Sequence, residues 1–184
     1  MSPATSPGLT LIEAAVLGLL VRQPSHGFAL AKEFDPDSRI GSIFTVQRPV
    51  VYRALNTLSA KNLVIGDAAE ASATGPARVV KHVTLEGRAR AMEWITTPVS
   101  NMRGVRVELL VKLALQDYLG IEPLPFVRRQ YEVLEPVYRA LRTDPSALPP
   151  GFDRTRATWR WENSEAVMRF LHRVIEDNSP QESV

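Results

Sequence analysis

The stretch from Phe44 to Val64, FTVQRPVVYRALNTLSAKNLV, most constrains how this 184-residue chain can fold. At helical spacing, Val51, Leu55 and Leu58 fall on one side of it. This apolar side predicts a helix that packs on a core. Pro49 must lie in the first turn of that helix, because a proline further in would break the backbone hydrogen bonds.

The opposite side of the same helix carries groups that suit nucleic acid. Arg48, Tyr52 and Asn56 share this side, and Arg53 lies beside them. Gln47 and Arg48 stand at the N-terminal end, where Arg can pair with guanine and Gln with adenine. Arg53 is a candidate for phosphate contact. The alternative is a solvated surface helix, because Arg and Tyr are common on outer faces.

Two helices are predicted before this one. Thr10 and Glu13 form a T-x-x-E capping box, and the apolar run to Val21 predicts a buried helix. Ser25 is the predicted N-cap of the second helix. Its predicted inward residues are Phe28, Leu30, Ala31 and Phe34.

Two strands and a fourth helix are predicted after it. Residues 63–65 and 78–83 are predicted strands, joined by a small, polar hairpin tip at residues 66–77. Thr84 is the predicted cap of a helix that runs to about Ile95. Its predicted apolar side consists of Leu85, Ala89, Met92 and Ile95. The order of helix, helix, helix, strand, wing, strand, helix predicts a winged helix-turn-helix.

The second half of the chain is predicted to be all-helical, so that the fold class is mainly α. Residues 108–119 are amphipathic, and Gly120 is the predicted C′ residue. A heptad-like stripe follows at Val127, Tyr131, Leu134, Tyr138 and Leu141. The last predicted helix, residues 155–177, has an apolar stripe at Val167, Phe170, Leu171 and Val174.

We therefore expect two domains with a tail at each end. The winged helix-turn-helix is expected at residues 9–97 and a helical dimerisation domain at 103–178. Residues 1–8 and 179–184 are expected to be disordered tails. Dimerisation is expected because the apolar helices of the second half have little else to pack on, and two-fold symmetry is the usual solution.

Composition excludes several classes of function. The chain has no cysteine, which rules out disulfides, thiolate catalysis and cysteine-based zinc sites and fits a cytoplasmic protein. It contains no recognised catalytic, phosphate-loop or metal-binding motif, so we expect no enzyme activity, cofactor or metal. Residues 1–106 hold 12 Lys or Arg against 8 Asp or Glu, which assigns a polyanionic partner to this half.

With these elements in order, the chain resembles the PadR family of transcriptional regulators. The blocks that carry the resemblance are SHGFALAKEF at residues 25–34, RPVVYRALNTL at 48–58 with KNLV after it, and TLEGRA at 84–89. The resemblance implies a homodimeric cytoplasmic repressor whose winged helices bind the major grooves of a pseudo-palindromic operator. Some members are activators, and some release DNA when a small aromatic molecule binds.

The resemblance also implies roles for single residues. It makes Tyr52 a donor to a phosphate oxygen. This sequence departs from the family at Gln47, where a small hydroxyl residue is usual, and at Phe28 and Lys81, where tyrosine is common. Further candidates for the DNA backbone or the minor groove are Ser25, His26, Lys61, Arg78, Lys81 and His82. Helix capping, a soluble hairpin edge and plain solvation are the alternatives for these six.

The tryptophans raise a separate question. Trp94, Trp159 and Trp161 are candidates for stacking on an aromatic effector, and packing in the core or at a dimer interface is the alternative. A winged helix that binds only another protein is the alternative to a DNA-binding function. The steep salt dependence of phosphate contacts distinguishes the two.

Overall fold

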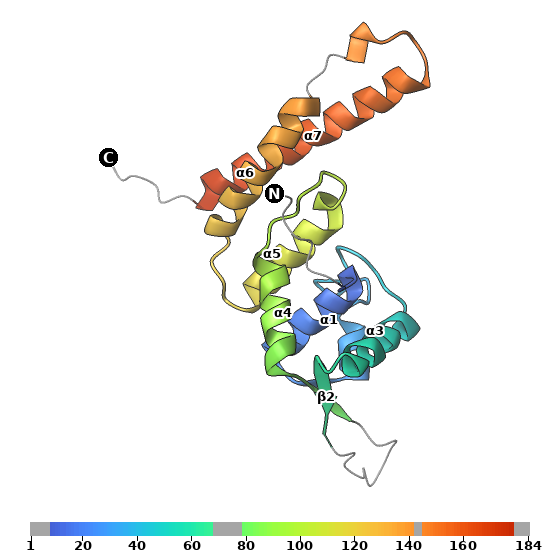
Figure 1. Cartoon of the computed structure of the whole chain (residues 1–184), viewed down its shortest axis with the longest axis vertical. Coiled ribbons are helices and arrows are strands. Elements are labelled where there is room, and N and C mark those ends of the chain that lie inside the picture. Colours follow the sequence, from blue (N-terminus) through green and yellow to red (C-terminus); the bar gives the residue numbers. More distant parts are fainter. Residues whose placement is uncertain (1–7, 68–78, 142–144, 179–184) are drawn as a thin grey trace, which may run out of the picture. The chain divides into compact units, whose positions relative to one another are not determined.

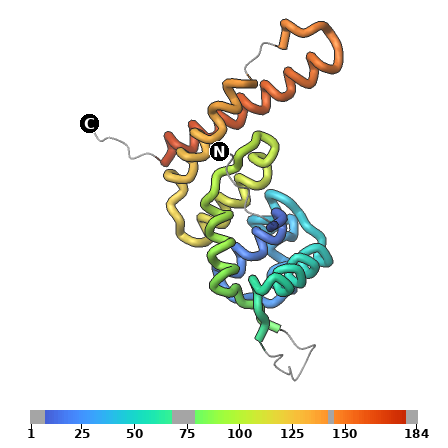
Figure 2. Tube along the Cα trace, viewed as in Figure 1, coloured from blue at the N-terminus to red at the C-terminus, as the bar shows by residue number. Residues whose placement is uncertain are grey.

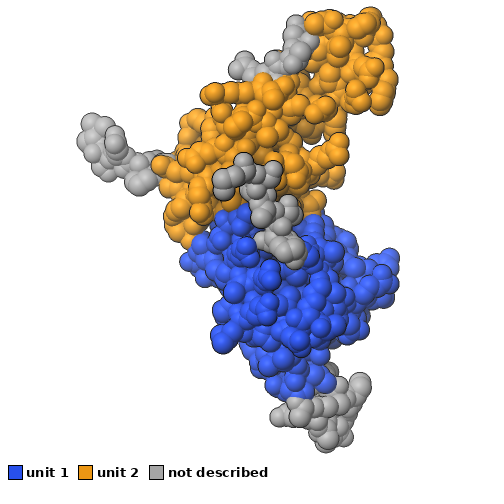
Figure 3. All heavy atoms as spheres, in the orientation of Figure 1, with its two compact units in different colours: residues 1–97, 110–121 blue, residues 98–109, 122–184 orange. Residues whose placement is uncertain are grey.

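The computed structural model describes residues 8–67, 79–141 and 145–178. The chain divides into two compact units, shown in blue and orange in Figure 3. The first unit comprises residues 1–97 and 110–121, and the second comprises residues 98–109 and 122–184. The tails expected at residues 1–8 and 179–184 lie outside the described residues, apart from Gly8.

The first unit is a winged helix-turn-helix with one further helix (Figure 1). Its elements in chain order are α1 (Leu11–Arg22), β1 (Ser25–His26), α2 (Gly27–Lys32), α3 (Arg48–Ala60), β2 (Val64–Gly66), β3 (Val80–Val83), α4 (Leu85–Thr96) and α5 (Leu110–Tyr118). The sheet is antiparallel, in the order β1-β3-β2. The predicted order of elements is confirmed, and β1 is an addition that the sequence did not indicate.

Helix α1 lies at the centre of this unit. Every residue from Glu13 to Val21 is buried, and α3, α4, α5 and β3 all pack on this helix. The predicted capping box is present, because the Thr10 hydroxyl accepts from the Glu13 N–H and the Glu13 carboxylate accepts from the Thr10 N–H. The element order therefore surrounds one apolar helix that is capped by its own first turn.

Helix α5 packs within the first unit, which differs from the division expected from the sequence. The Lys112 ammonium donates to the Thr97 carbonyl at 2.7 Å, and the Gln116 amide donates to the Ile95 carbonyl at 3.0 Å. Both side chains are buried. They satisfy carbonyls at the C-terminal end of α4, where the helix itself leaves its carbonyls without partners.

The last turn of α5 is fixed by Gly120 and Tyr118. Gly120 has a φ of +66°, and the Ile121 N–H donates to the Gln116 carbonyl, which confirms the predicted C′ glycine. The Tyr118 hydroxyl donates to the Glu33 carboxylate at 3.3 Å. Burial, and then the Glu33 charge, raise the pKa of Tyr118 above its ordinary value.

The second unit is a helical hairpin with short helical turns before it and within it. Its elements are η1, a π-helical turn at Val105–Leu109, then α6 (Leu124–Leu141), η2 (Pro145–Ala147) and α7 (Phe152–Asn178). Helices α6 and α7 lie side by side and run in opposite directions (Figure 2). The Tyr138 hydroxyl of α6 donates to Glu165 of α7 at 2.7 Å.

Two predicted apolar sides are partly wrong, although Leu171 of α7 and Ile95 of α4 are buried as predicted. On α7, Phe170 is 37% exposed, and the buried residues are Ser164, Met168 and Leu171. On α4, Leu85 is 89% exposed and Ala89 is also exposed. The buried residues of α4 are Gly87, Ala91 and Ile95. On α4, Gly87 and Ala91 mark the buried side, because small residues allow a neighbouring element to come close. Among the described helices, none combines the length and the apolar character needed to span a membrane.

We predict that Gly87→Ala destabilises the protein by about 1–3 kcal/mol, as overpacking does. A Cβ atom at Gly87 would lie 2.1 Å from the Leu63 carbonyl oxygen, so either the helix or the strand must move. Urea unfolding followed by circular dichroism measures the change. Without this close contact, alanine would stabilise the helix by about 1 kcal/mol through its propensity. A stabilised variant would therefore contradict the packing described here.

Candidate nucleic-acid interface

Helix α3 has one buried and one exposed side, as predicted. Val51, Leu55 and Leu58 are no more than 2% exposed, and each contributes about 1.5–3 kcal/mol through burial. Helices α1 and α2 pack on α3, so that its polar side is left for solvent. The exposed polar residues at its start and along this side are Gln47, Arg48, Tyr52, Arg53 and Asn56.

The N-terminal end of α3 presents an exposed side-chain amide. Gln47 is the N-cap, but its side chain makes no capping hydrogen bond. Pro49 lies in the first turn, as predicted. The exposed Gln47 amide is therefore available at the end of the helix where the macrodipole favours anions.

Arg48 is held over an exposed aromatic ring. Its guanidinium carbon lies 5.0 Å from the centroid of the Phe28 ring, and its Nη2 atom lies 4.0 Å from a carboxylate oxygen of Asp35. The Lys32 ammonium lies 5.1 Å from the same ring. Each exposed cation–π contact contributes about 0.5–1 kcal/mol. The contact with Phe28 therefore restricts the Arg48 side chain, which is still 53% exposed.

The inward position predicted for Phe28 is wrong, since this ring is 45% exposed. Helix α2 has only six residues and buries Leu30 and Ala31. Phe28 lies two positions before Leu30, which at about 100° per residue places it on the opposite side of the helix.

His26 has the capping role that was predicted for Ser25. Its Nδ1 atom accepts from the Ala29 N–H at 3.0 Å, while Ser25 belongs to β1 and its hydroxyl donates to the Gln23 carbonyl at 3.5 Å. Because Nδ1 accepts, the neutral imidazole carries its proton on Nε2. This leaves an N–H donor on His26 for an external acceptor.

Tyr52 lies against the backbone at the start of α2. A Cβ atom at Gly27 would lie 2.6 Å from Cε1 of Tyr52, so only glycine permits this approach. The Tyr52 side chain is nevertheless 43% exposed. Within the described ranges, its hydroxyl has no hydrogen-bond partner and Arg53 has no ion pair. Both side chains therefore offer polar groups to solvent.

The wing holds its two described cationic candidates differently. The Nε2 atom of His82 lies 2.8 Å from a carboxylate oxygen of Asp67, the residue that directly follows β2. Lys81 pairs in register with Ser25 of β1 and has no ion pair with any residue that the structure describes. Arg78 and residues 68–77 of the predicted hairpin tip lie outside the described residues.

Lys61, the C-cap residue of α3, is engaged within the protein. Its ammonium donates to the Gly8 carbonyl at 2.7 Å and to the Glu13 carboxylate at 3.3 Å. The Glu13 side chain is only 8% exposed. Lys61 thus neutralises a nearly buried carboxylate, which leaves less of its charge for a polyanion.

Comparison with protein families identifies this unit. Residues 16–93, from the middle of α1 to most of α4, match the model of the Transcriptional regulator PadR-like family. The chain therefore contains a PadR-like segment over residues 16–93. No curated protein sequence matches the chain significantly.

Several solved structures resemble the whole chain at low sequence identity. Bacillus subtilis PadR in complex with operator DNA has 15% identity and a TM-score of 0.47, over 92% of this chain and 100% of that one. The Vibrio cholerae virulence activator AphA has 18% identity and a TM-score of 0.38, over 90% and 96%. Bacillus subtilis PadR in complex with p-coumaric acid has 16% identity and a TM-score of 0.40, over 95% and 98%.

The three tryptophans are divided between the two units. Trp94 belongs to the first unit, where the Lys112 ammonium lies 4.6 Å from its ring. Trp159, in the second unit, is 69% exposed and lines a cavity of about 950 Å³. Trp161 is half-buried, and neither it nor Trp94 lines that cavity.

Sequence reasoning missed the residues that contact Arg48, Lys61 and His82 within the protein. Phe28 and Asp35 hold Arg48, Glu13 holds Lys61, and Asp67 holds His82. None of these contacts lies within one helical turn, so the spacing of residues gave no signal for them.

We expect Lys61→Ala to lower the free energy of unfolding by about 1–3 kcal/mol, because it removes a partner from a nearly buried carboxylate. Chemical denaturation measures the loss. Arg53→Ala is the matched control on the same helix, since Arg53 is exposed and lacks an ion pair in the described ranges. Equal stability of the two variants would show that the Lys61–Glu13 contact contributes nothing.

Proposed function

We propose that this PadR-like chain is a homodimeric transcriptional repressor that binds a pseudo-palindromic operator. Helix α3 of each protomer lies in a major groove and the wing contacts the adjacent backbone. The observation that carries this proposal is the exposed side of α3. It combines an amide, two guanidinium groups and a phenol, and all four side chains are exposed.

The residues divide into those that read bases and those that bind phosphates. Gln47 and Arg48 stand at the end of α3 and contact base edges, where Arg pairs with guanine and Gln with adenine. Tyr52 and Arg53 donate to phosphate oxygens. The Phe28 ring already restricts the Arg48 side chain in the free protein. Arg48 therefore loses less conformational entropy when it binds DNA.

A second set of groups contacts the backbone around the helix. Lys81 and Arg78 place the wing against the phosphates, and His82 joins them when it leaves Asp67. His26 offers its Nε2 proton and Ser25 its hydroxyl at the start of α2. Lys61 contributes least, because Glu13 already neutralises it.

The second unit supports the homodimer. Its two helices leave large apolar side chains exposed: Val133 at 40%, Phe152 at 79% and Phe170 at 37%. Exposed apolar groups of this size are typical of surfaces that bind a partner. A second copy of the same hairpin buries them by two-fold symmetry. Release of DNA by a small effector completes the proposal, with Trp159 as the stacking residue.

Fluorescence anisotropy with DNA from immediately upstream of the protein's own gene tests the function. A shuffled duplex is the control, and both are titrated at two salt concentrations. The proposal predicts binding that is tight, sequence-dependent and steeply weakened by salt, because phosphate contacts release counterions. A protein-binding module would be favoured by weak, salt-insensitive binding that is equal for both duplexes. The same result would have to be obtained with fragments from the rest of the genome.

Two variants separate base reading from phosphate binding. Arg48→Ala is expected to weaken binding to the operator about 10-fold or more and to reduce discrimination against the shuffled duplex, since a bidentate base contact is worth about 1–3 kcal/mol. Lys81→Ala is expected to weaken binding to both duplexes alike and to lower the salt slope by about 1 per protomer.

The same anisotropy titrations measure both variants, and circular dichroism confirms that each is folded. Small and equal losses for the two variants would remove Arg48 from the base-reading position. A selective loss for Lys81→Ala would reverse the assignment of helix and wing.

A further inference from the structure

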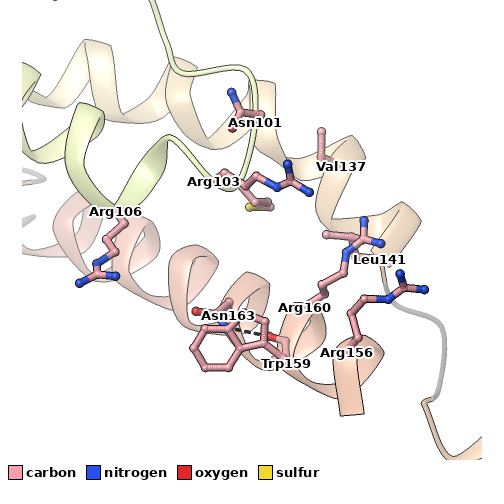
Figure 4. A pocket seen from close by; sticks show the side chains of 10 residues that line it. Asn101, Arg103, Arg106, Val137, Leu141, Arg156, Trp159, Arg160 and Asn163 are labelled. Atoms are coloured by element: carbon pink, nitrogen blue, oxygen red, sulfur yellow. Dashed lines mark hydrogen bonds between the residues drawn. The ribbon is translucent and has the colours of Figure 1, made fainter. Parts of the chain in front are cut away.

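The cavity beside Trp159 lies wholly within the second unit. It has a volume of about 950 Å³ and is formed by residues 101–106, the C-terminal end of α6 and the first turns of α7 (Figure 4). A volume of this order matches a small-molecule site.

The lining of this cavity is strongly cationic. It includes Arg103, Arg106, Arg156 and Arg160, and no Asp or Glu is among the described residues that line it. Figure 4 shows the guanidinium groups of Arg103, Arg156 and Arg160 toward the Val137–Leu141 side, and that of Arg106 on the other side of Trp159.

Most of this charge lacks a counterion in the described part of the chain. Arg156 pairs with Asp153 at 3.0 Å, whereas Arg103, Arg106 and Arg160 have no ion pair with a described residue. Like charges gathered at one cavity repel one another, and a bound anion relieves this repulsion. Guanidinium groups bind phosphate and carboxylate oxygens in bidentate pairs, which makes Arg the preferred residue for such anions.

An apolar surface lies next to the cationic one. The Trp159 indole is exposed, and Met102, Val137 and Leu141 complete the apolar part of the lining. The Asn163 amide donates to the Trp159 carbonyl at 2.7 Å, so that its oxygen stays available as an acceptor. A flat ring can stack on Trp159 while charged substituents reach the arginines.

We propose that this cavity binds a small aromatic ligand with at least two negative charges, of the type of an aryl phosphate. A single carboxylate leaves most of the cationic charge uncompensated, while a dianion engages two or more guanidinium groups at once. The inference rests on the proposed function only in naming the chemical class of the effector. Binding is measured on the free protein, so that failure to bind DNA leaves it standing.

Isothermal titration calorimetry of the full-length protein at pH 8 tests the inference with four probes. These are phenyl phosphate, benzoate, benzyl alcohol and inorganic phosphate. Phosphate monoesters have a second pKa of about 6, so phenyl phosphate is a dianion at this pH. We expect phenyl phosphate to bind at least 10-fold more tightly than each of the other three probes. Benzoate lacks the second charge, benzyl alcohol lacks any charge and inorganic phosphate lacks the ring.

Three variants locate the site. Arg103→Gln and Arg160→Gln are each expected to weaken phenyl phosphate binding about 10-fold or more, and both residues are exposed, so the fold is retained. Arg173→Gln, on the same helix as Arg160 but outside the cavity lining, is the matched control and should leave affinity unchanged.

Other outcomes overturn the inference. If benzoate binds as tightly as phenyl phosphate, the ligand does not need two charges. If inorganic phosphate binds as tightly, the ligand does not need an aromatic ring. Absence of binding by all four probes, or equal affinity of the wild type and Arg160→Gln, would show that the arginines do not form a site for this class of ligand.

Discussion

The burial of α1 on all sides is the constraint on which the first unit depends. An apolar helix of this kind has no outer face, so α3, α4, α5 and β3 must cover it. Its one buried charge, Glu13, is compensated by the Thr10 N–H and the Lys61 ammonium. Because α3 covers α1 with Val51, Leu55 and Leu58, its opposite side must face solvent. The cationic surface of α3 is thus a geometric consequence of how α1 is buried.

Local chemistry made much of the fold predictable. The Thr10–Glu13 capping box, Thr84 at the start of α4, Pro49 in the first turn of α3 and Gly120 after α5 all lie where the sequence predicts. Each depends on groups within about one helical turn, and such signals can be read from neighbouring residues.

The failures concern contacts between distant parts of the chain. Leu85 is exposed on α4 because Gly87 approaches the Leu63 carbonyl and thereby sets which side of the helix is buried. Helix α5 joins the first unit because Lys112 and Gln116 bind carbonyls near the end of α4. A two-residue strand such as β1 has no periodicity, so it left no pattern in the sequence.

The candidate interface shows the same division. The sequence predicted which residues of α3 are exposed, because helical spacing alone determines that. It did not predict that Arg48 lies over Phe28, that Lys61 pairs with Glu13 or that His82 pairs with Asp67. These contacts make the candidates unequal, since a cation with an internal partner loses part of that interaction when it binds a phosphate.

The central claim is that the exposed side of α3 reads DNA, and a crystal structure of the protein with its operator duplex tests this most directly. The account predicts that α3 lies in the major groove with the Arg48 guanidinium at hydrogen-bond distance, about 2.7–3.2 Å, from a base edge. It also predicts Tyr52 and Arg53 on phosphates and Lys61 still paired with Glu13. A complex in which this side of α3 is turned away from the duplex would contradict the account.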